Sequence, residues 1–119
     1  MGKETINLSD YDFIIKNKTR KNAIKKIFIE DKIFDFEFDF HFIGYKYHFK
    51  NCEFKKVKIY NYEDNYELIF QNCSFLNILD ISDVKFKKNV KFWESTFNKV
   101  NFHNATFNGL ADFWSCTFN

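Results

Sequence analysis

The sequence predicts an all-β solenoid whose coils each have four sides, and three observations support that fold. Between residues 49 and 118, apolar residues recur at every fifth or sixth position. That spacing fits neither the 3.6-residue period of a helix nor the two-residue period of a strand. The chain has 18 Phe but no Pro and only 3 Gly, which disfavours a hairpin-rich sandwich with many tight turns. Repeated units of this kind bury their apolar faces by stacking on one another.

The apolar centres of the repeat define the sides of each coil. On the first side, equivalent centres recur after 21, 22 and 21 residues, at Phe49, Phe70, Phe92 and Phe113. The other three sides stack, in order, Phe54, Phe75, Phe97 and Phe118; Ile59, Ile81 and Phe102; and Asn65, Phe86 and Phe107. Successive coils should lie about 4.8 Å apart, the spacing of neighbouring strands. Asn65 breaks the apolar pattern, so a loop or bulge is expected from Tyr60 to Asn65.

A second apolar or small residue lies two positions before each centre. These inner positions are Tyr47, Leu68, Val90 and Ala111 on the first side, and Cys52, Cys73, Ser95 and Cys116 on the second. Both sets should point inward, and the polar residues between them should face water. Each buried Phe then stabilises the fold by about 1.5–3 kcal/mol. This register makes Phe102 a core residue, whose change to Asp should unfold the domain, whereas Lys99→Glu should be nearly silent.

These units resemble pentapeptide-repeat proteins, whose loose pattern is Ala-(Asp/Asn)-(Leu/Phe)-X-X. The closest units are Ala105-Thr106-Phe107 and Ala111-Asp112-Phe113, and the resemblance covers residues 47–119. The sequence departs from the pattern in its use of Phe for Leu, in Cys or Val for Ala, and in several six-residue steps. The resemblance implies a right-handed quadrilateral β-helix.

The N-terminal segment lacks the repeat. We expect residues 1–32 to form an irregular cap and residues 33–119 the β-helix, with regular repeats from about residue 47. The basic segment from Lys16 to Lys26 favours a short helix within that cap, with Thr19 as its N-cap. The apolar face of this helix would be Ile24, Ile27 and Phe28. A nucleic-acid-binding arm is the alternative for the same segment.

A strand is predicted directly after the cap, because aromatic and mostly acidic residues alternate there. The aromatic positions are Phe34, Phe36, Phe38, Phe40 and Phe42, and the alternating ones are Asp35, Glu37, Asp39 and His41. This two-residue period gives one aromatic face and one largely acidic face. The strand is either the first, irregular coil or a strand packed along the wall of the solenoid, and the first is favoured.

Charge and hydropathy limit the cellular context. The net charge of +2 is close to neutral and gives little attraction to nucleic acid. No apolar run approaches the roughly 18 residues of a membrane span, and Met1–Ile6 has no apolar signal core. A cytoplasmic protein with reduced thiols is therefore expected.

No residue pattern points to catalysis or to a bound cofactor. In the repeat pattern of the family, the inner position held by Cys52, Cys73 and Cys116 takes a small residue. Buried free Cys behaves as a small hydrophobe, so these thiols are expected to be structural. The close cysteine pairs of metal motifs are absent from the sequence. His41, His48 and His103 fall on different sides of the coil. We therefore predict no enzyme activity, no metal and no cofactor.

Two features suggest protein contacts instead. Trp93 and Trp114 each follow a first-side centre, one coil apart, so they should stack on the outer surface above Lys50 and Gln71. Exposed aromatic pairs are enriched at interfaces. The repeat also stops at Asn119 without a capping helix, which leaves a strand edge. Either the C-terminal coil forms an end-to-end dimer or the chain is part of a longer protein.

The function predicted is a protein-binding or scaffold module. One alternative comes from the resemblance, since some pentapeptide-repeat proteins are DNA mimics that bind type II topoisomerases such as gyrase. Mimicry needs rows of carboxylates, and the only acidic row here is Asp35, Glu37 and Asp39. Direct nucleic-acid binding would instead use residues 16–26 with Lys55, Lys56 and Lys58. A further alternative is a soluble domain of a larger protein, including a membrane protein.

Overall fold

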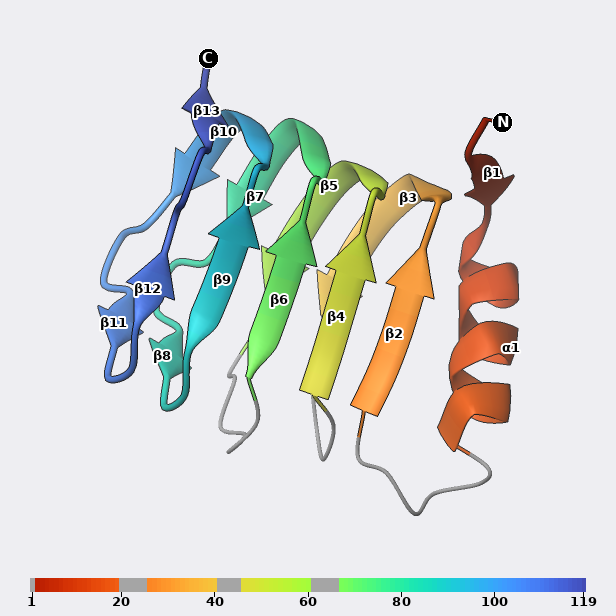
Figure 1. The fold of residues 1–119 in the computed structure, drawn as a ribbon, viewed down its shortest axis with the longest axis horizontal. Coiled ribbons are helices and arrows are strands. Elements are labelled where there is room, and N and C mark those ends of the chain that lie inside the picture. The colour runs from red at the N-terminus through yellow and green to blue at the C-terminus, as the bar shows by residue number, and fades with distance from the viewer. Residues whose placement is uncertain (1, 20–25, 41–45, 61–66) are drawn as a thin grey trace.

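The computed structural model describes residues 2–19, 26–40, 46–60 and 67–119, and it shows a stack of parallel coils that advances from the N-terminus to the C-terminus (Figure 1). A five-stranded parallel sheet forms the first side of every coil. Its strands, in spatial order, are β12 (Ala111–Asp112), β9 (Val90–Trp93), β6 (Leu68–Gln71), β4 (Lys46–Lys50) and β2 (Lys26–Glu30). The predicted solenoid is therefore confirmed.

A six-stranded parallel sheet forms the second and third sides. Its strands, in spatial order, are β1 (Glu4–Ile6), β3 (Lys32–Phe40), β5 (Glu53–Ile59), β7 (Ser74–Asp80), β10 (Thr96–Asn101) and β13 (Thr117–Phe118). The register of the longer strands shifts within each pair, for example between Phe54 and Val57. Such bulges bend a strand, so one strand serves two sides. The fourth side is described only where β8 (Lys85–Phe86) pairs with β11 (Thr106–Phe107).

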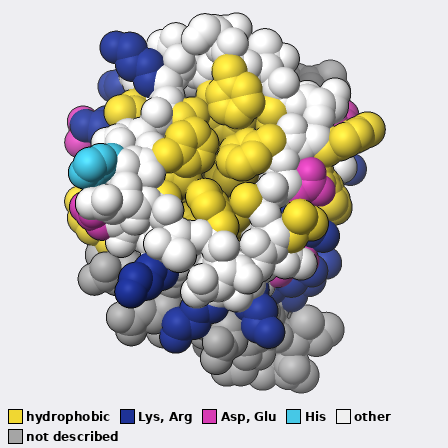
Figure 2. Space-filling view, turned by 90° about the vertical axis from the view of Figure 1, so that its left-hand side faces the viewer, with side chains coloured by type: hydrophobic (Ala, Val, Ile, Leu, Met, Phe, Trp, Pro, Cys, Tyr) yellow, Lys and Arg dark blue, Asp and Glu magenta, His cyan; other side chains and the backbone are white. Residues whose placement is uncertain are grey.

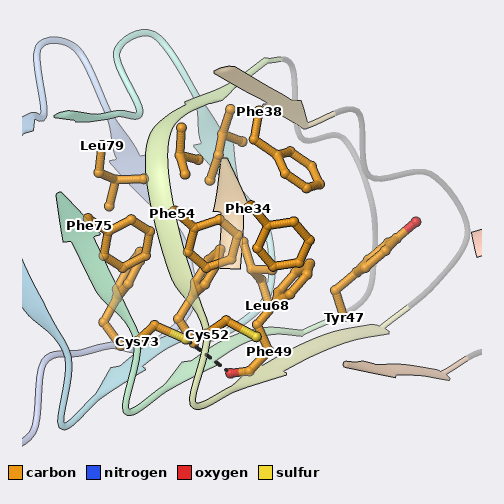
Figure 3. Close-up of a cluster of buried hydrophobic side chains, with 14 of the residues drawn as sticks. Phe34, Phe38, Tyr47, Phe49, Cys52, Phe54, Leu68, Cys73, Phe75 and Leu79 are labelled. Carbon is orange, nitrogen blue, oxygen red and sulfur yellow. Dashed lines mark hydrogen bonds between the residues drawn. The ribbon is translucent and has the colours of Figure 1, made fainter. Parts of the chain in front are cut away.

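The aromatic columns predicted from the repeat are present inside the coils (Figure 3). On the first side the ring centroids of Phe49, Phe70, Phe92 and Phe113 follow one another at 5.3, 5.3 and 5.2 Å, with nearly parallel planes. On the second side Phe54, Phe75, Phe97 and Phe118 are separated by 5.3, 5.0 and 5.0 Å. Phe86 and Phe107 stack at 5.2 Å on the fourth side. Asn65, with residues 61–64 of the expected loop, lies outside the described residues.

The corner between the first two sides uses a left-handed backbone conformation. Asp31, Asn51, Asn72, Glu94 and Ser115 occupy this corner in successive coils, with φ between 51° and 59°. The Asn51 amide donates to Asp31 Oδ1 at 2.6 Å, and the Asn72 amide donates to Asn51 Oδ1 at 3.3 Å. Asn and Asp tolerate positive φ better than other residues with a side chain. Asp or Asn holds this corner in the first three coils, and their side chains form a ladder parallel to the solenoid axis.

The N-terminal helix lies in a different place from the one predicted. The structure has α1 at Leu8–Thr19, so Thr19 ends a helix instead of capping one. Asn7 is the N-cap: its side chain accepts from the Asp10 backbone N–H at 2.9 Å, and Asp10 accepts from the Asn7 N–H at 3.1 Å. This reciprocal pair is a capping box. The helix predicted over Lys16–Lys26 is therefore wrong, and Ile24 lies outside the described residues.

The solenoid includes residues that the sequence analysis placed in the cap. β2 pairs in register with β4, with Ile27 opposite Tyr47 and Ile29 opposite Phe49. Ile27 and Ile29 are buried because alternate residues of a strand point to the same face. The predicted division between residues 32 and 33 thus falls inside the first coil, after the first residue of β3.

The strand predicted from alternating aromatics is β3, and it belongs to the first coil. It pairs in parallel with β5, and Phe34 stacks on Phe54 at 4.7 Å. Beyond it, α1 covers the end of the core: Tyr11 lies 5.7 Å from Phe34 and 4.4 Å from Phe38 between ring centroids. The N-terminal end of the solenoid is therefore closed by the helix and by β1, which pairs with β3.

Phe102 is not the core residue that the register suggested. Its side chain is 39% exposed, whereas Phe70 on the first side is fully buried. Phe102 follows β10, where no further coil in the structure covers the third side (Figure 1). Phe102 does lie in the predicted column with Ile59 and Ile81, but it is the last residue of that column in the structure.

This difference in burial predicts that truncating Phe70 lowers the free energy of unfolding more than truncating Phe102. Phe70→Ala should lower the free energy of unfolding by about 3–5 kcal/mol, because it removes a ring packed between two others. Phe102→Ala should cost about 1 kcal/mol or less, because a ring already partly in water loses less on truncation. Urea melts of both variants measure the difference. Equal losses would contradict the burial described here.

The corner ladder predicts a stabilising substitution. Glu94→Asn should raise the free energy of unfolding by about 0.5–1 kcal/mol, because Asn accepts positive φ more readily and extends the amide ladder from Asn72. Glu94→Gln is the matched control, since it carries an amide on a longer chain and should give little change. Thermal melts of the two variants test this, and a loss of stability in Glu94→Asn would count against the ladder.

Candidate protein-binding surface

The outer face of the five-stranded sheet carries both tryptophans. Alternate residues of these strands point outward, so Lys50, Gln71 and Trp93 follow one another in register along β4, β6 and β9. Trp114 continues the column directly after β12, where its carbonyl accepts from the Glu94 N–H at 2.9 Å. The residues of the expected column therefore lie in register on the outer face of the sheet, one in each coil.

The two indoles have different surroundings. Trp93 is half-buried: its Nε1 donates to Asp112 Oδ2 at 2.8 Å, and Lys91 Nζ lies 4.7 Å from its ring centroid. Trp114 is 63% exposed, and its backbone N–H donates to Asp112 Oδ1 at 3.0 Å. Within the described part of the chain, no ring-to-ring contact joins the two indoles. Asp112 thus fixes the indole of one tryptophan and the backbone of the other.

A charged network supports the Trp93 side of this surface. Glu67 bridges two lysines from neighbouring coils, at 3.0 Å from Lys46 and 3.0 Å from Lys91. Burial alone would raise the pKa of Glu67, but hydrogen bonds from the two lysines outweigh it and hold that pKa below its ordinary value. Lys91 is therefore held between a carboxylate and the Trp93 ring, which fixes the position of both.

His48 lies on the same sheet, on β4, two strands before Trp93 on β9. Its ring meets the edge of Phe28 at 5.0 Å between centroids, and its Nε2 is hydrogen-bonded to Gln71 Oε1 at 3.0 Å. Burial lowers the pKa of His48, and the charges of nearby lysines lower it further. His103 is exposed beyond β10, and His41 lies outside the described residues. Within the described ranges, no cluster of His, Cys, Asp and Glu could hold a metal ion.

The inner cysteine column bonds to the backbone of the preceding coil. Cys73 Sγ donates to the Phe49 carbonyl at 3.4 Å (Figure 3), and Ser95 Oγ donates to the Phe70 carbonyl at 3.3 Å. Cys52 and Cys116 make the equivalent contacts with Ile29 and Phe92. The sequence analysis recognised the small size of these residues but missed their shared role as donors, which explains why Ser fits among cysteines. Burial raises the pKa of the Cys73 thiol, which keeps it protonated.

The acidic row predicted on β3 faces lysines of the next coil. Glu37 lies opposite Lys56 and Asp39 opposite Lys58 in the strand register. Lys56 pairs with Glu37 at 3.4 Å, and Lys58 pairs with Asp80 at 3.2 Å and donates to Ser82 at 3.1 Å. These side chains line a shallow hollow with Tyr60. Lysines of β5 therefore lie directly beside the carboxylates of β3, so this surface is not continuously acidic.

The C-terminal end of the solenoid exposes part of the aromatic core. Hydrophobic side chains gather in the middle of this face, within a rim of polar atoms (Figure 2). Phe118 is 55% exposed, and Phe107 and Phe113 are partly buried beside Phe102. The rings of Phe102 and Phe113 meet edge to face at 5.9 Å. Unlike the N-terminal end, this face has no helix over it among the described residues.

The lowered pKa of His48 predicts a pH-dependent stability. Its ordinary pKa is 6.5, so the unfolded chain binds a proton below that pH more readily than the folded protein does. The free energy of unfolding should therefore fall as the pH drops from 6.5 toward the folded-state pKa. Glu67 and Asp80, whose ordinary values are 4.5 and 3.8, contribute only in more acidic solution.

The measurement is a series of urea melts between pH 5 and 8 on three proteins. His48→Gln should remove the slope seen in the wild type, because the residue no longer titrates. His103→Gln, at the exposed histidine, should retain it. The same slope in His48→Gln would assign the effect to another group.

Comparison with known proteins agrees with this architecture. Residues 70–117 match the family model of pentapeptide repeats (9 copies), and this range runs from the second half of β6 to the first residue of β13. No curated protein and no solved structure gives a significant match to the chain. In the described part of the chain, no helix is long and apolar enough to cross a membrane. The family match over residues 70–117 and the stacked four-sided coils support a pentapeptide-repeat protein.

Proposed function

We propose that this protein is a non-enzymatic scaffold module that binds another protein through Trp93 and Trp114 on the five-stranded sheet. The observation that carries the proposal is Trp114, whose indole is 63% exposed beside a Trp93 ring that Asp112 and Lys91 hold in place. Exposed tryptophans supply large contact area and are enriched among residues that dominate binding energy. A side chain fixed before binding loses little conformational entropy in the complex.

The surroundings of Trp114 suit an interface. Leu110, at the other end of β12, is 56% exposed, so the last strand of the sheet offers two apolar side chains with Asp112 between them. Glu67 and Lys91 provide a paired polar border next to Trp93. An apolar centre with a polar rim is the usual composition of a protein–protein interface.

The nucleic-acid alternatives receive less support. The carboxylates of β3 face Lys56 and Lys58, so the described surface offers no unbroken acidic row that could imitate a phosphate backbone. Two of the lysines that direct binding to nucleic acid would use, Lys56 and Lys58, are held in ion pairs. A protein partner therefore remains the better proposal over a gyrase-type DNA mimic or a DNA-binding surface.

The proposed location is the cytoplasm. Cys52, Cys73 and Cys116 are free thiols in this fold, which suits a reducing compartment. The same tryptophan surface would serve if the chain is a domain of a larger protein, including one anchored in a membrane.

Changing the two tryptophans should abolish partner binding without unfolding the protein. The Trp93→Ala/Trp114→Ala double variant should capture much less partner from lysate of the native cells, since both rings leave the surface. The control is Tyr60→Ala/Leu76→Ala, which removes two exposed apolar side chains beyond the five-stranded sheet. Quantitative mass spectrometry compares the captured proteins, and thermal melts verify folding.

A protein retained by the wild type and the control but lost from the tryptophan variant supports the proposal. Equal capture by all three proteins would contradict it. Because Trp93 is partly buried, Trp114→Ala alone is tested in parallel, and its exposed position makes it the less disruptive change.

A further inference from the structure

Residues 108–110 form the corner that joins β11, on the fourth side, to β12, on the first side of the next coil (Figure 1). The backbone N–H of Asn108 donates to the Phe86 carbonyl at 2.9 Å, so the register between β8 and β11 continues into this corner. Asn108 therefore lies beside Lys87 of the preceding coil, and Gly109 lies beside Lys88.

Gly109 is packed directly against the backbone of the preceding coil. A Cβ atom at this position would lie 2.7 Å from the carbonyl carbon of Lys88 and 2.9 Å from its oxygen. It would also lie 2.9 Å from Asn89 Oδ1, which accepts a hydrogen bond from the Leu110 N–H at 2.9 Å. Only a residue without a side chain fits so close an approach of two backbones. The packing of the coils therefore requires glycine at residue 109.

The required glycine follows an asparagine, and this order of residues permits an intramolecular reaction. The backbone nitrogen after an asparagine lies close to the carbonyl carbon of the asparagine side chain, so the two groups meet at a high effective concentration. A side chain on the second residue hinders their approach, and glycine has none. The Asn108 side chain is exposed, and among the described residues neither its amide nor the Gly109 N–H has a hydrogen-bond partner. Both groups are therefore available to react.

The other asparagines lack this combination. Asn108 is the only asparagine in the sequence that precedes a glycine. Asn104 is also exposed, but the N–H of Ala105 after it donates to a backbone carbonyl at 2.9 Å. The side-chain amide of Asn98 donates to the Leu76 carbonyl at 3.2 Å. These two residues therefore serve as internal references for the reactivity of Asn108.

We propose that Asn108 is a modification site, at which the folded protein loses ammonia and forms a succinimide with Gly109. Solvent base removes the proton of the Gly109 nitrogen, which attacks Asn108 Cγ. The new N–Cγ bond closes a five-membered ring, the Cγ–Nδ2 bond breaks, and Nδ2 leaves as ammonia after taking up a proton. Water then opens the ring at either carbonyl and gives aspartate or isoaspartate. Water is the only co-reactant, and the inference does not depend on the proposed tryptophan surface.

The two products have different consequences for the fold. Aspartate keeps the ordinary backbone and places a carboxylate beside Lys87, so the corner is retained. Isoaspartate routes the backbone through the side chain and adds a methylene before Gly109, where the backbone of Lys88 leaves no free space. The corner must then move and shift β12 against β9. Because Asp112 on β12 accepts from Trp93 Nε1 at 2.8 Å, this shift also reaches the outer wall.

The test is peptide mass spectrometry of the full chain after incubation of the folded protein at neutral and mildly alkaline pH. Asn108 should convert roughly tenfold faster than Asn98 or Asn104, a difference of about 1.4 kcal/mol in activation free energy. The rate should rise with pH, because the attacking nitrogen must lose its proton. The matched control is Asn108→Gln, which keeps the amide but would need a six-membered ring and should therefore remain unconverted over the same period.

Conversion that is confined to Asn108 in the folded wild type and absent from Asn108→Gln supports the proposal. Three outcomes would overturn it: no conversion of the folded protein, conversion only after unfolding in urea, or equal rates at Asn98 and Asn104. Thermal melts of both proteins before incubation establish that the reaction is followed in the folded state.

Hydrogen exchange tests the structural consequence. Three proteins are compared: the fresh wild type, the chromatographically separated isoaspartate form, and Asn108→Asp, which represents the other product. Backbone amides of β12 should exchange faster in the isoaspartate form alone, while those of β4, which lies three strands away in the same sheet, should not change. Equal exchange of β12 in all three proteins would contradict the predicted displacement of the corner.

Discussion

The stacking of aromatic rings between coils is the constraint on which the rest of the structure depends. Neighbouring strands in a sheet lie about 4.8 Å apart, and the Phe centroids of the first and second sides repeat at 5.0–5.3 Å. Parallel rings can therefore occupy the same position in every coil without distorting the sheet. A smaller residue in one coil would leave a gap between two rings, which explains why Phe fills both columns from residue 49 onward.

Because the rings must stack, every coil has to turn at the same position, and contacts between corner residues of successive coils fix that position. Asn51 and Asn72 adopt positive φ and bond to the side chain of the coil before, so each corner is positioned by its predecessor. The inner cysteines add a second fixed point, because Cys73 and Ser95 bond to a carbonyl of the preceding coil close to the same corner. Corner and core are therefore linked, since a shift at the corner would also separate stacked rings.

The sequence was informative where one residue type repeats in phase, and less informative elsewhere. The columns through Phe49 and Phe54 could be predicted because each is a long apolar series. Only part of the first coil was predicted. Its first side, β2, was missed because Ile27 and Ile29 replace the aromatic residues, and β3 was recognised only as irregular because a bulge places Glu37 opposite Lys56, which disturbs the five-residue phase. Phe102 satisfied the pattern and is still exposed, since a repeat identifies which residues share a column but not where the column stops. For the candidate surface, the column of Trp93 and Trp114 was predictable, whereas the Asp112 contact that distinguishes them required the strand register.

A core built in this way leaves only two kinds of surface for function. Side-chain columns on the walls can vary without disturbing the stacked rings, and several of the described charges there are paired, as Lys91 is with Glu67 and Lys58 with Asp80. The ends differ, because an end exposes the core itself. At the N-terminal end α1 covers Phe34 and Phe38, so the aromatic column meets a helix instead of water. At the C-terminal end the same column reaches Phe118 in a stretch almost without charge. The two described ends therefore differ in chemistry, because one is covered by a helix and the other exposes part of the aromatic core.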